Sequence, residues 1–260
     1  MVKYDMNMKK LLIFIFLIGT TSYTGRAQKE ASKLAIVFIG NSITQGKGGP
    51  EGSPPPTHAV HYLKQKRGLS DLPYINVGRS GSTTVDWLPE TKKFFSLALN
   101  AADSLSKLPG YGLVFSLKLG TNDSAMKGPN GAPVSGTTYR QNITKIIDTL
   151  LQRYAGSEVI LHHPIWYSTN TYNTSMYLEE GLERLNSYIP ILDELVLSYR
   201  DRFPGRVHLG DTKAYKYFKK NPQYFKNEQG QQGIFHLHPN EAGTKVLGEF
   251  WGKAIHRRIR

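Results

Sequence analysis

The sequence predicts an α/β fold built on a parallel sheet, from two observations. Short apolar runs alternate along the chain with longer segments of helical periodicity, which is the pattern of repeated βαβ units. The short runs are also rich in Val, Ile, Leu and Phe, as is typical of strands buried on both faces. We expect five central strands, at residues 34–39, 74–77, 112–119, 158–162 and 206–209.

Three helices follow from the spacing of apolar residues. The first has one stripe that faces the sheet, formed by Ile143, Ile146, Ile147, Leu150, Leu151 and Tyr154. A second is expected from about residue 177 to residue 202, with a kink or break at Pro190. The last begins near Pro239 and Asn240 and buries Val246, Leu247, Phe250, Trp251 and Ile255. Residues 46–56, rich in Gly and Pro, are predicted to form a loop within one domain.

Residues 1–27 have the three regions of a secretory signal peptide. Lys9 and Lys10 give a positive start, residues 11–18 form an apolar run, and residues 20–27 form a small, polar end. The run is too short to span a bilayer, which takes roughly 20 apolar residues. We expect cleavage after Ala27, which leaves residues 28–260 as one catalytic domain in the periplasm or outside the cell.

Cysteine content and charge exclude several classes of protein. The chain has no cysteine, hence no disulfide framework, thiolate nucleophile, thiolate metal site or lipid-bearing cysteine at the cleavage point. Residues 28–260 carry +10 of the net charge of +13, because residues 1–27 hold four bases and one acid. These bases are scattered, so we interpret them as a solvated surface, ahead of a preference for anionic glycans. Neither nucleic acid binding nor membrane insertion is expected.

Four loops at strand ends hold residues that suit chemistry, since ligands in such sheets bind at the carboxyl ends of the strands. Ser42 lies in Gly-Asn-Ser-Ile-Thr, a turn that exposes its hydroxyl beside the N–H groups of a helix start. Gly81 follows the second strand, Asn122 lies in Leu-Gly-Thr-Asn-Asp-Ser after the third, and His238 precedes the last helix. Taken singly, each also fits ordinary turn chemistry, such as an Asx turn at Asn122.

In order and placement, these blocks resemble the SGNH (GDSL-like) hydrolase family over nearly all of residues 28–260. The variant forms of the blocks look most like exported bacterial carbohydrate acetylesterases. The resemblance implies a flavodoxin-like, three-layer α/β/α sandwich with a five-stranded parallel sheet of order 2-1-3-4-5. It also implies Ser42 as nucleophile, His238 as its general base, and an oxyanion hole formed by the N–H groups of Ser42 and Gly81 and the side chain of Asn122.

The third member of the triad departs from that family. Phe235 stands three residues before His238, where the family carries Asp, and a phenyl ring cannot orient imidazole. We favour Glu228 as the acid, because the loop 226–233 has the length to fold a carboxylate against the base. Asp211, a backbone carbonyl and a Ser–His dyad are the alternatives. A shifted register with His236 as base fits less well, because Pro239, Asn240 and Gly243 follow His238 at the family spacing.

The expected reaction is hydrolysis of a short acyl ester, with O-acetyl groups on carbohydrate as the favoured substrate and no cofactor or metal. The pair His162 and His163 lacks a third metal ligand of evident spacing, so we expect one of the two to line the substrate cleft. The residues expected to bind substrate are Asn41, Asp123, His163 and Trp166, with Trp87, Tyr167 and Tyr172 as further aromatic platforms for a sugar.

Three other functions fit the same residues. One is another short-chain esterase or thioesterase, and a second is a lipase or phospholipase, although the sequence has no exposed apolar segment that suggests a lid. The third belongs to a different class, a glycan-binding protein that has kept the fold and lost catalysis. The presence of serine, glycine, asparagine and histidine together argues against that last function.

Overall fold

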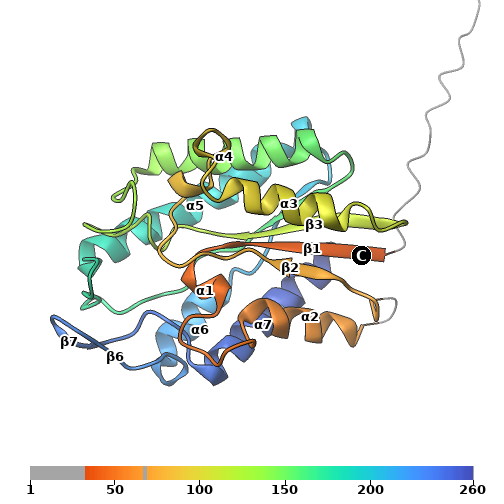
Figure 1. Ribbon diagram of the computed structural model, residues 1–260. Helices are drawn as coiled ribbons and strands as arrows, with labels where there is room; N and C mark the ends of the chain where they lie inside the picture. Colours follow the sequence, from red (N-terminus) through yellow and green to blue (C-terminus); the bar gives the residue numbers. More distant parts are fainter. Residues whose placement is uncertain (1–32, 67–68, 260) are drawn as a thin grey trace, which may run out of the picture. The chain divides into compact units, whose positions relative to one another are not determined.

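The computed structural model describes residues 33–66 and 69–259 (Figure 1). The predicted signal peptide at residues 1–27 lies outside the described residues, so its cleavage and export stay predictions. Within the described ranges, no helix combines the length and the apolar character that crossing a bilayer requires.

Five parallel strands form the central sheet, in the order β2-β1-β3-β4-β5. β1 (Lys33–Gly40) and β3 (Tyr111–Lys118) pair along their whole length, so that Gly40 lies opposite Lys118 at their carboxyl ends. β2 (Tyr74–Asn76) forms one edge, and β4 (Glu158–Leu161) and β5 (Val207–Leu209) complete the other side. The five expected strands are all present, and the predicted order is confirmed.

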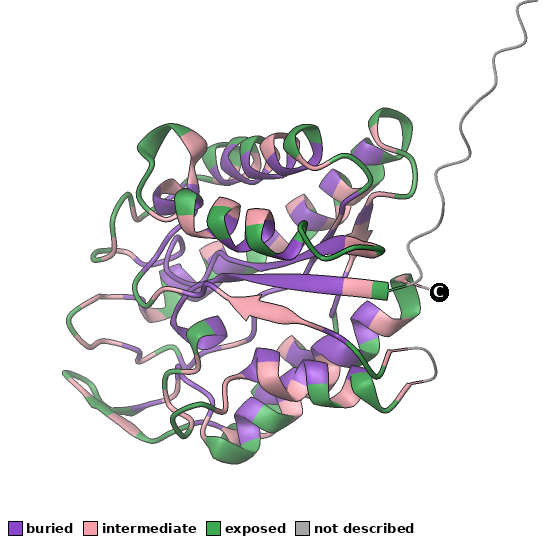
Figure 2. Ribbon diagram, turned by 45° about the vertical axis from the view of Figure 1, so that its right-hand side comes forward, coloured by how far each residue is buried: buried purple, intermediate pink, exposed green. Residues whose placement is uncertain are grey.

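Helices cover both faces of the sheet, which gives three layers (Figure 1). α3 (Phe95–Leu105), α4 (Gly136–Arg153) and α5 (Leu178–Arg202) pack on one face, and α2 (Pro55–Lys64), α6 (Ala214–Lys220) and α7 (Glu241–Arg258) pack on the other. Alternate residues of each strand enter the two cores: Val37 belongs to the α3–α5 side and Phe38 to the α2–α7 side. Burial is accordingly highest in β1, β3 and β4 and on the inward faces of the helices, whereas the edge strand β2 is only partly buried (Figure 2).

Two proline-containing segments differ in part from their predictions. α5 is continuous through Pro190, so the structure excludes a break there. Tyr188 and Leu192, which flank Pro190, are buried in the core, and this burial offsets an interior proline's cost of about 3 kcal/mol. The loop predicted to reach residue 56 ends earlier, because Pro55 and Pro56 form the first turn of α2, where a missing N–H breaks no helical bond.

A two-stranded antiparallel hairpin follows β5, in a region that the sequence led us to treat as loop. Its strands are β6 (Glu228–Gly230) and β7 (Gly233–Phe235), and their register places Glu228 directly opposite Phe235. The hairpin lies at the end of the sheet where α1 (Ser42–Gln45) follows β1 (Figure 1). Three short 3₁₀ helices complete the described elements: η1 (Val85–Trp87), η2 (Pro89–Thr91) and η3 (Pro222–Tyr224).

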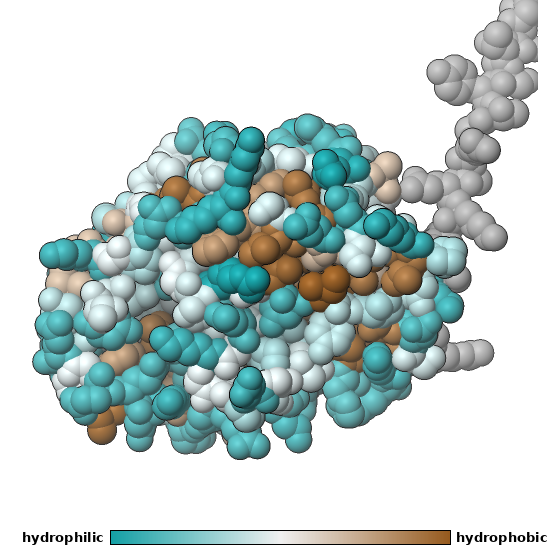
Figure 3. All heavy atoms as spheres, viewed as in Figure 1, coloured by the Kyte–Doolittle hydropathy of each residue, from teal (hydrophilic) through white to brown (hydrophobic). Residues whose placement is uncertain are grey.

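The face shown in Figure 3 carries its apolar side chains near the centre, over α3 and the edge strand β2. Partly buried apolar residues of these elements include Ile75, Leu97 and Leu99. In the same view, the end with α1 and the hairpin is mainly hydrophilic. The end of the sheet that carries the candidate site is therefore not the apolar part of this face.

Candidate active site

Ser42 is the first residue of α1, on a tight turn after β1. Asn41 caps this helix, because its Oδ1 accepts the Ile43 N–H at 3.1 Å. The turn requires glycine at position 40, since a Cβ there would lie 2.1 Å from Thr44 Oγ1 and 2.7 Å from the Lys118 carbonyl oxygen. The turn places the Ser42 side chain at the carboxyl end of the sheet.

His238 meets Ser42 across 196 positions of sequence, with 2.9 Å between Ser42 Oγ and His238 Nε2. The histidine lies just before α7, whose N-cap is Asn240, with Oδ1 accepting the Gly243 N–H at 2.9 Å. Ser42 is 6% exposed and His238 is 3% exposed. The serine–histidine pair expected from the sequence is therefore formed in a largely enclosed setting.

Glu228 completes the chain of contacts on the other side of the imidazole. Its two carboxylate oxygens lie 2.8 and 2.9 Å from His238 Nδ1, and Oε1 also accepts the His238 backbone N–H at 3.2 Å. Burial alone would raise the pKa of Glu228, but the hydrogen bonds and charge of His238, with a smaller effect of Lys47, lower it below the usual value. The carboxylate thus stays ionised, which suits a group that must stabilise an imidazolium.

The hairpin explains how a carboxylate reaches His238 although Phe235 occupies the position where the family carries Asp. Phe235 is 1% exposed and belongs to the core on the α3–α5 side. Its partner across the antiparallel ladder is Glu228. Opposed residues in such a ladder are only about 5 Å apart, so a longer carboxylate on the paired strand reaches the same imidazole.

The alternative acid and the alternative base both lie in other surroundings. The carboxylate of Asp211 lies just before α6 and accepts the N–H groups of Lys213 at 3.0 Å and Ala214 at 3.2 Å. Burial raises the pKa of Asp211. His236 Nε2 lies 3.0 Å from Asn227 Oδ1, and its ring stacks on Phe225. Neither residue has a hydrogen bond to Ser42 or His238 within the described ranges.

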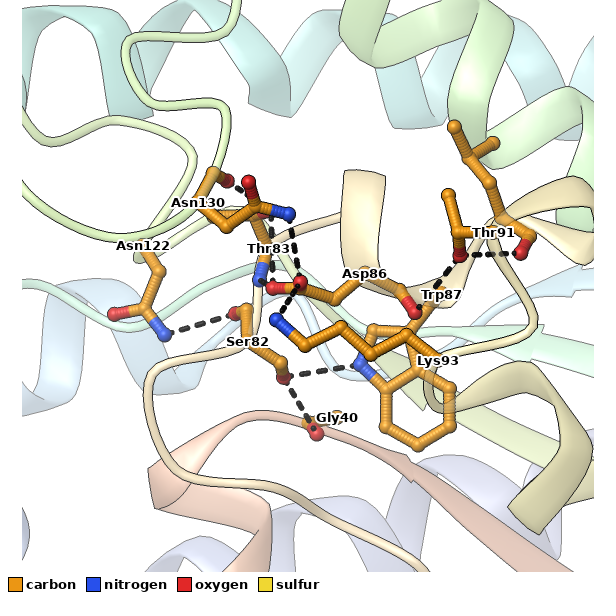
Figure 4. Close-up of polar contacts among 10 residues, drawn as sticks. Gly40, Ser82, Thr83, Asp86, Trp87, Thr91, Lys93, Asn122 and Asn130 are labelled. Atoms are coloured by element: carbon orange, nitrogen blue, oxygen red, sulfur yellow. Dashed lines mark hydrogen bonds and ion pairs between the residues drawn. The ribbon is translucent and has the colours of Figure 1, made fainter.

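The three expected oxyanion donors lie on neighbouring loops. Asn122 Nδ2 donates to the Ser82 carbonyl oxygen at 2.8 Å, which joins the loop after β3 to the loop that carries Gly81 (Figure 4). That bond uses one of the two amide hydrogens and leaves the second available. Gly81 has a φ of 74°, and a Cβ there would have no atom within 4 Å. Among the residues that the structure describes, the N–H groups of Ser42 and Gly81 donate to no protein acceptor.

A buried polar network, which the sequence did not predict, supports this side of the site. Ser82 Oγ accepts from Trp87 Nε1 at 3.0 Å and donates to the Gly40 carbonyl oxygen at 3.3 Å (Figure 4). Asp123 Oδ1 accepts the Thr84 N–H at 2.7 Å. These bonds tie the ends of β1 and β3 to the Gly81 loop, so the donors of the expected oxyanion hole share one support.

Asn41 and Asp123, which we expected to bind substrate, are instead buried parts of this support. Both are 0% exposed. Asn41 caps α1, and Asp123 holds Thr84. Burial raises the pKa of Asp123 to about 6, against the opposing effect of its bonds to Thr84. Their side chains face the protein interior, which corrects the expectation for both.

The histidine pair after β4 also has structural partners. His163 Nε2 lies 2.8 Å from Asp193 Oδ1 on α5. His162 Nδ1 accepts the Asp211 N–H at 3.0 Å, so its Nε2 carries the hydrogen that binds Ser116 Oγ at 2.9 Å. Burial, with the charges of His163 and Lys118, lowers the pKa of His162 to about 3. Both histidines are thus committed to other side chains, contrary to the expectation that one would contact substrate.

The expected aromatic platforms divide into two groups. Trp87 and Tyr167 are 0% exposed core residues and are unable to stack on a sugar, which corrects that expectation. Trp166 and Tyr172 are half-buried, and Trp166 packs edge-on against Phe225 with ring centroids 5.8 Å apart. Only these two remain candidates for contact with substrate. Within the described ranges, no cluster of three or more His, Asp or Glu side chains is arranged to hold a metal ion.

Comparison with known proteins identifies the family. The model of the GDSL-like lipase/acylhydrolase family matches residues 38–246, a span that includes every residue of the expected catalytic and oxyanion sets. The chain belongs to this family. It therefore lies among the SGNH esterases and acylhydrolases, as the sequence blocks indicated. No curated protein sequence matches the chain.

Solved structures share the fold of this family member over most of their length. A lipase/acylhydrolase from Enterococcus faecalis is 21% identical, with 86% of this chain and 96% of that chain covered and a TM-score of 0.55. A catalytic mutant of an acetylxylan esterase from Geobacillus stearothermophilus is 16% identical, with 87% and 94% covered and a TM-score of 0.56. A lipase from a goat rumen metagenome is 15% identical, with 87% and 100% covered and a TM-score of 0.58. At these levels of sequence identity, the comparisons show a shared fold.

Proposed function

We propose that this family member is a serine esterase that hydrolyses short acyl esters, with O-acetyl groups on carbohydrate as its main substrates. The observation that carries the proposal is the unbroken chain of contacts from Ser42 through His238 to Glu228. A hydroxyl, an imidazole and an ionised carboxylate in this order are the parts that activate a serine nucleophile.

The mechanism follows from the atoms in contact. His238 Nε2 takes the proton of Ser42 Oγ as the oxygen attacks the ester carbonyl, and Glu228 stabilises the imidazolium through Nδ1. The N–H groups of Ser42 and Gly81 and the free amide hydrogen of Asn122 bind the oxyanion that forms. His238 then protonates the leaving alcohol. In the second half-reaction His238 takes a proton from the water that attacks the acyl-enzyme, and it returns this proton to Ser42 Oγ as the carboxylic acid is released.

Surface character supports a short acyl group. In the described part of the chain, the large apolar residues with high exposure are Leu108, Leu197 and Ile234, and of these only Ile234 belongs to the hairpin that carries Glu228. A lipase needs a broad apolar entrance, because burial of a long chain contributes about 0.8 kcal/mol per CH₂. Trp166 and Tyr172 remain available to contact a sugar. The acetylxylan esterase among the structures of like fold is consistent with a carbohydrate ester.

The test compares p-nitrophenyl esters of increasing chain length on the wild type and on Ser42→Ala. Acetyl should be hydrolysed far faster than octanoyl or longer groups, and Ser42→Ala should abolish hydrolysis. Equal or faster rates on long chains would exclude the acetylesterase. Binding of glycans without turnover would indicate the non-catalytic glycan-binding protein instead. A screen of acetylated polysaccharides for released acetate then identifies the natural class of substrate.

We also propose that the enzyme acts outside the cytoplasm, on polymers that do not enter the cell. The support is the pattern of residues 1–27, with its positive start, apolar run and small polar end. The N-terminal sequence of protein purified from the native host should begin at Gln28. A chain that keeps Met1 and stays in the cytoplasm would contradict export and leave the esterase proposal intact.

A further inference from the structure

Tyr177, the residue before α5, is hydrogen-bonded to the side-chain amide of Asn122. Its hydroxyl donates to Asn122 Oδ1 at 2.7 Å, while Asn122 Nδ2 donates to the Ser82 carbonyl oxygen at 2.8 Å. A carbonyl oxygen only accepts, so Ser82 requires the nitrogen on its own side. The two bonds together define one orientation of the amide and leave a single N–H free.

We propose that Tyr177 is a positioning residue of the oxyanion hole, acting through Asn122 without touching substrate. This inference rests on the proposed esterase function. An oxyanion donor is effective when it is held in place before charge develops. Without the Tyr177 hydroxyl, Asn122 Oδ1 loses its donor, and only the bond to the Ser82 carbonyl oxygen still holds the amide, so its free N–H is held less firmly toward the oxyanion.

The surroundings of Tyr177 keep its hydroxyl a donor. Its side chain is 3% exposed and packs edge-on against Tyr167, with ring centroids 5.4 Å apart. Burial raises the pKa of Tyr177 well above its ordinary value of 10, and the nearby charges of Asp123 and Glu228 raise it further. The phenol therefore stays protonated at every pH at which a serine esterase works.

The backbone beside Tyr177 is strained. Leu178 has a φ of 55°, in the left-handed region that residues other than glycine seldom adopt. The Thr171 carbonyl oxygen accepts the N–H groups of Tyr177 at 3.1 Å and Leu178 at 3.4 Å. Strain of this kind persists where neighbouring contacts over-determine the conformation, and it gathers at functional sites. Here the strained residue follows Tyr177, whose hydroxyl is hydrogen-bonded to Asn122.

Residues 168–177, the connecting loop, also hold the hairpin that carries Glu228. Ser168 N–H donates to the His236 carbonyl oxygen at 3.0 Å, and His236 N–H donates to Ser168 Oγ at 2.8 Å. At the hairpin turn, Gln231 N–H donates to the Tyr172 carbonyl oxygen at 2.7 Å. One loop thus contacts both the support of the acid and the amide of the oxyanion hole.

The test is Tyr177→Phe, with Tyr167→Phe as the matched control. Tyr167 is equally buried, and its hydroxyl lies 2.9 Å from Ser124 Oγ, so the control also removes a buried hydroxyl contact, but one made to Ser124 and not to the Asn122 amide. With an acetyl ester, Tyr177→Phe should lower kcat by about tenfold and leave KM within about twofold, as expected for a bond that matters in the transition state. Tyr167→Phe should keep kcat within about twofold of the wild type.

A double-mutant cycle with Asn122→Ala separates positioning from general loss of structure. In the Asn122→Ala background, Tyr177→Phe should have no further effect on kcat, because its only route to the reaction is gone. Additive losses, or an equal loss in Tyr167→Phe, would overturn the proposal.

Nuclear magnetic resonance of the Asn122 side-chain NH₂ tests the orientation without any turnover. Its two proton signals, assigned by their loss in Asn122→Ala, should be sharp in the wild type and broadened in Tyr177→Phe by rotation of the amide about its Cβ–Cγ bond. Unchanged signals would overturn the positioning role. If the wild type were inactive but the signals were broadened in Tyr177→Phe, the esterase proposal would be refuted and the positioning of Asn122 by Tyr177 would stand.

Discussion

The two sides of the candidate site are held in different ways. On the oxyanion side, Ser82, Thr84, Asn122 and Asp123 are each at most 3% exposed, and their bonds tie together the ends of two long central strands. On the acid side, the Glu228 side chain is 16% exposed and belongs to a hairpin with three-residue strands. The loops that carry Gly81 and Asn122, the proposed oxyanion donors, are fixed by the fold itself. Glu228 is fixed by its contacts with His238 and by a short hairpin that is bonded to the loop 168–177.

The largest expected loss comes from the pair that lies between these two sides. Ser42→Ala and His238→Ala should each remove more than about 99% of kcat, roughly 3 kcal/mol of transition-state stabilisation or more. His236→Ala is the control and should cost less than about tenfold, because its ring contacts Asn227 and Phe225. Initial rates on acetyl esters, at constant fold by circular dichroism, measure this. An inactive His236→Ala beside an active His238→Ala would reverse the assignment of the base.

On the oxyanion side, Asn122→Ala should lower kcat by about 10²-fold with little change in KM. The amide hydrogen binds the oxyanion in the transition state and makes little contact with the ground state. Steady-state kinetics with an acetyl ester give both parameters. A change confined to KM would mean that Asn122 only binds substrate.

On the acid side, Glu228→Gln should lower kcat by at least about tenfold, because the imidazolium loses its ionised partner. Asp211→Asn is the matched control, since that carboxylate accepts N–H groups at the start of α6 and does not contact His238. It should leave kcat within about threefold and change the melting temperature little, because asparagine accepts hydrogen bonds at a helix start about as well as aspartate. If Glu228→Gln loses less than about tenfold, a Ser–His dyad is the better description.

A smaller effect tests whether the hairpin backbone matters to the acid. Gly233, the first residue of β7, has a φ of 87°, so Gly233→Ala places an ordinary residue in the left-handed region at a cost of about 1–2 kcal/mol. Gly205 has a φ of 69° outside the site, and a Cβ would have no atom within 4 Å at either position. Both variants should lose similar stability. Only Gly233→Ala should lower kcat, by about threefold. Equal kinetic effects would show that the hairpin does not support Glu228.

The smallest effect is a contrast in pH dependence between Asp123, which is buried, and Glu228, which is partly buried. The pKa of Asp123 in the folded protein is raised to about 6, above the unfolded value, so its contribution to stability increases as pH falls from about 6 towards 4. Relative to Asp123→Asn, the wild type should gain about 1 kcal/mol between pH 7 and pH 5. The pKa of Glu228 is lowered, so its contribution is present above the unfolded pKa and is lost as pH falls below about 4. Urea unfolding at several pH values measures both contributions to the free energy of unfolding. If the two contributions changed in the same direction as pH falls, the contrast would be contradicted.

Much of the fold and of the triad was predictable, because the signals are local. Each central strand is a short apolar run, and Ser42, Gly81, Asn122 and His238 lie in recognisable blocks at strand ends. Glu228 was favoured only from the length of its loop. The antiparallel register places Glu228 opposite Phe235. No local pattern in the sequence indicates this pairing, because it depends on the tertiary structure.

The errors in the site have a common physical origin. Asn41, Asp123 and His163 are polar residues at strand ends, where the sequence does not distinguish a side chain that faces substrate from one that faces inward. Trp87 and Tyr167 pose the same difficulty among the aromatic residues. Tyr177 had no signal at all, because its role depends on a single hydroxyl brought to Asn122 from 55 positions away.

The ladder between β6 and β7 also bears on how relatives of this protein are aligned. Glu228 and Phe235 are fixed opposite each other, but Gln231 and Gln232 lie between the paired strands. Residues inserted or deleted at this turn would change the number of positions between acid and base and leave their separation in space the same. In homologues with such a hairpin, the number of residues between the acid and the histidine can therefore vary. A sequence motif with a fixed spacing will miss the acid in some chains that carry one.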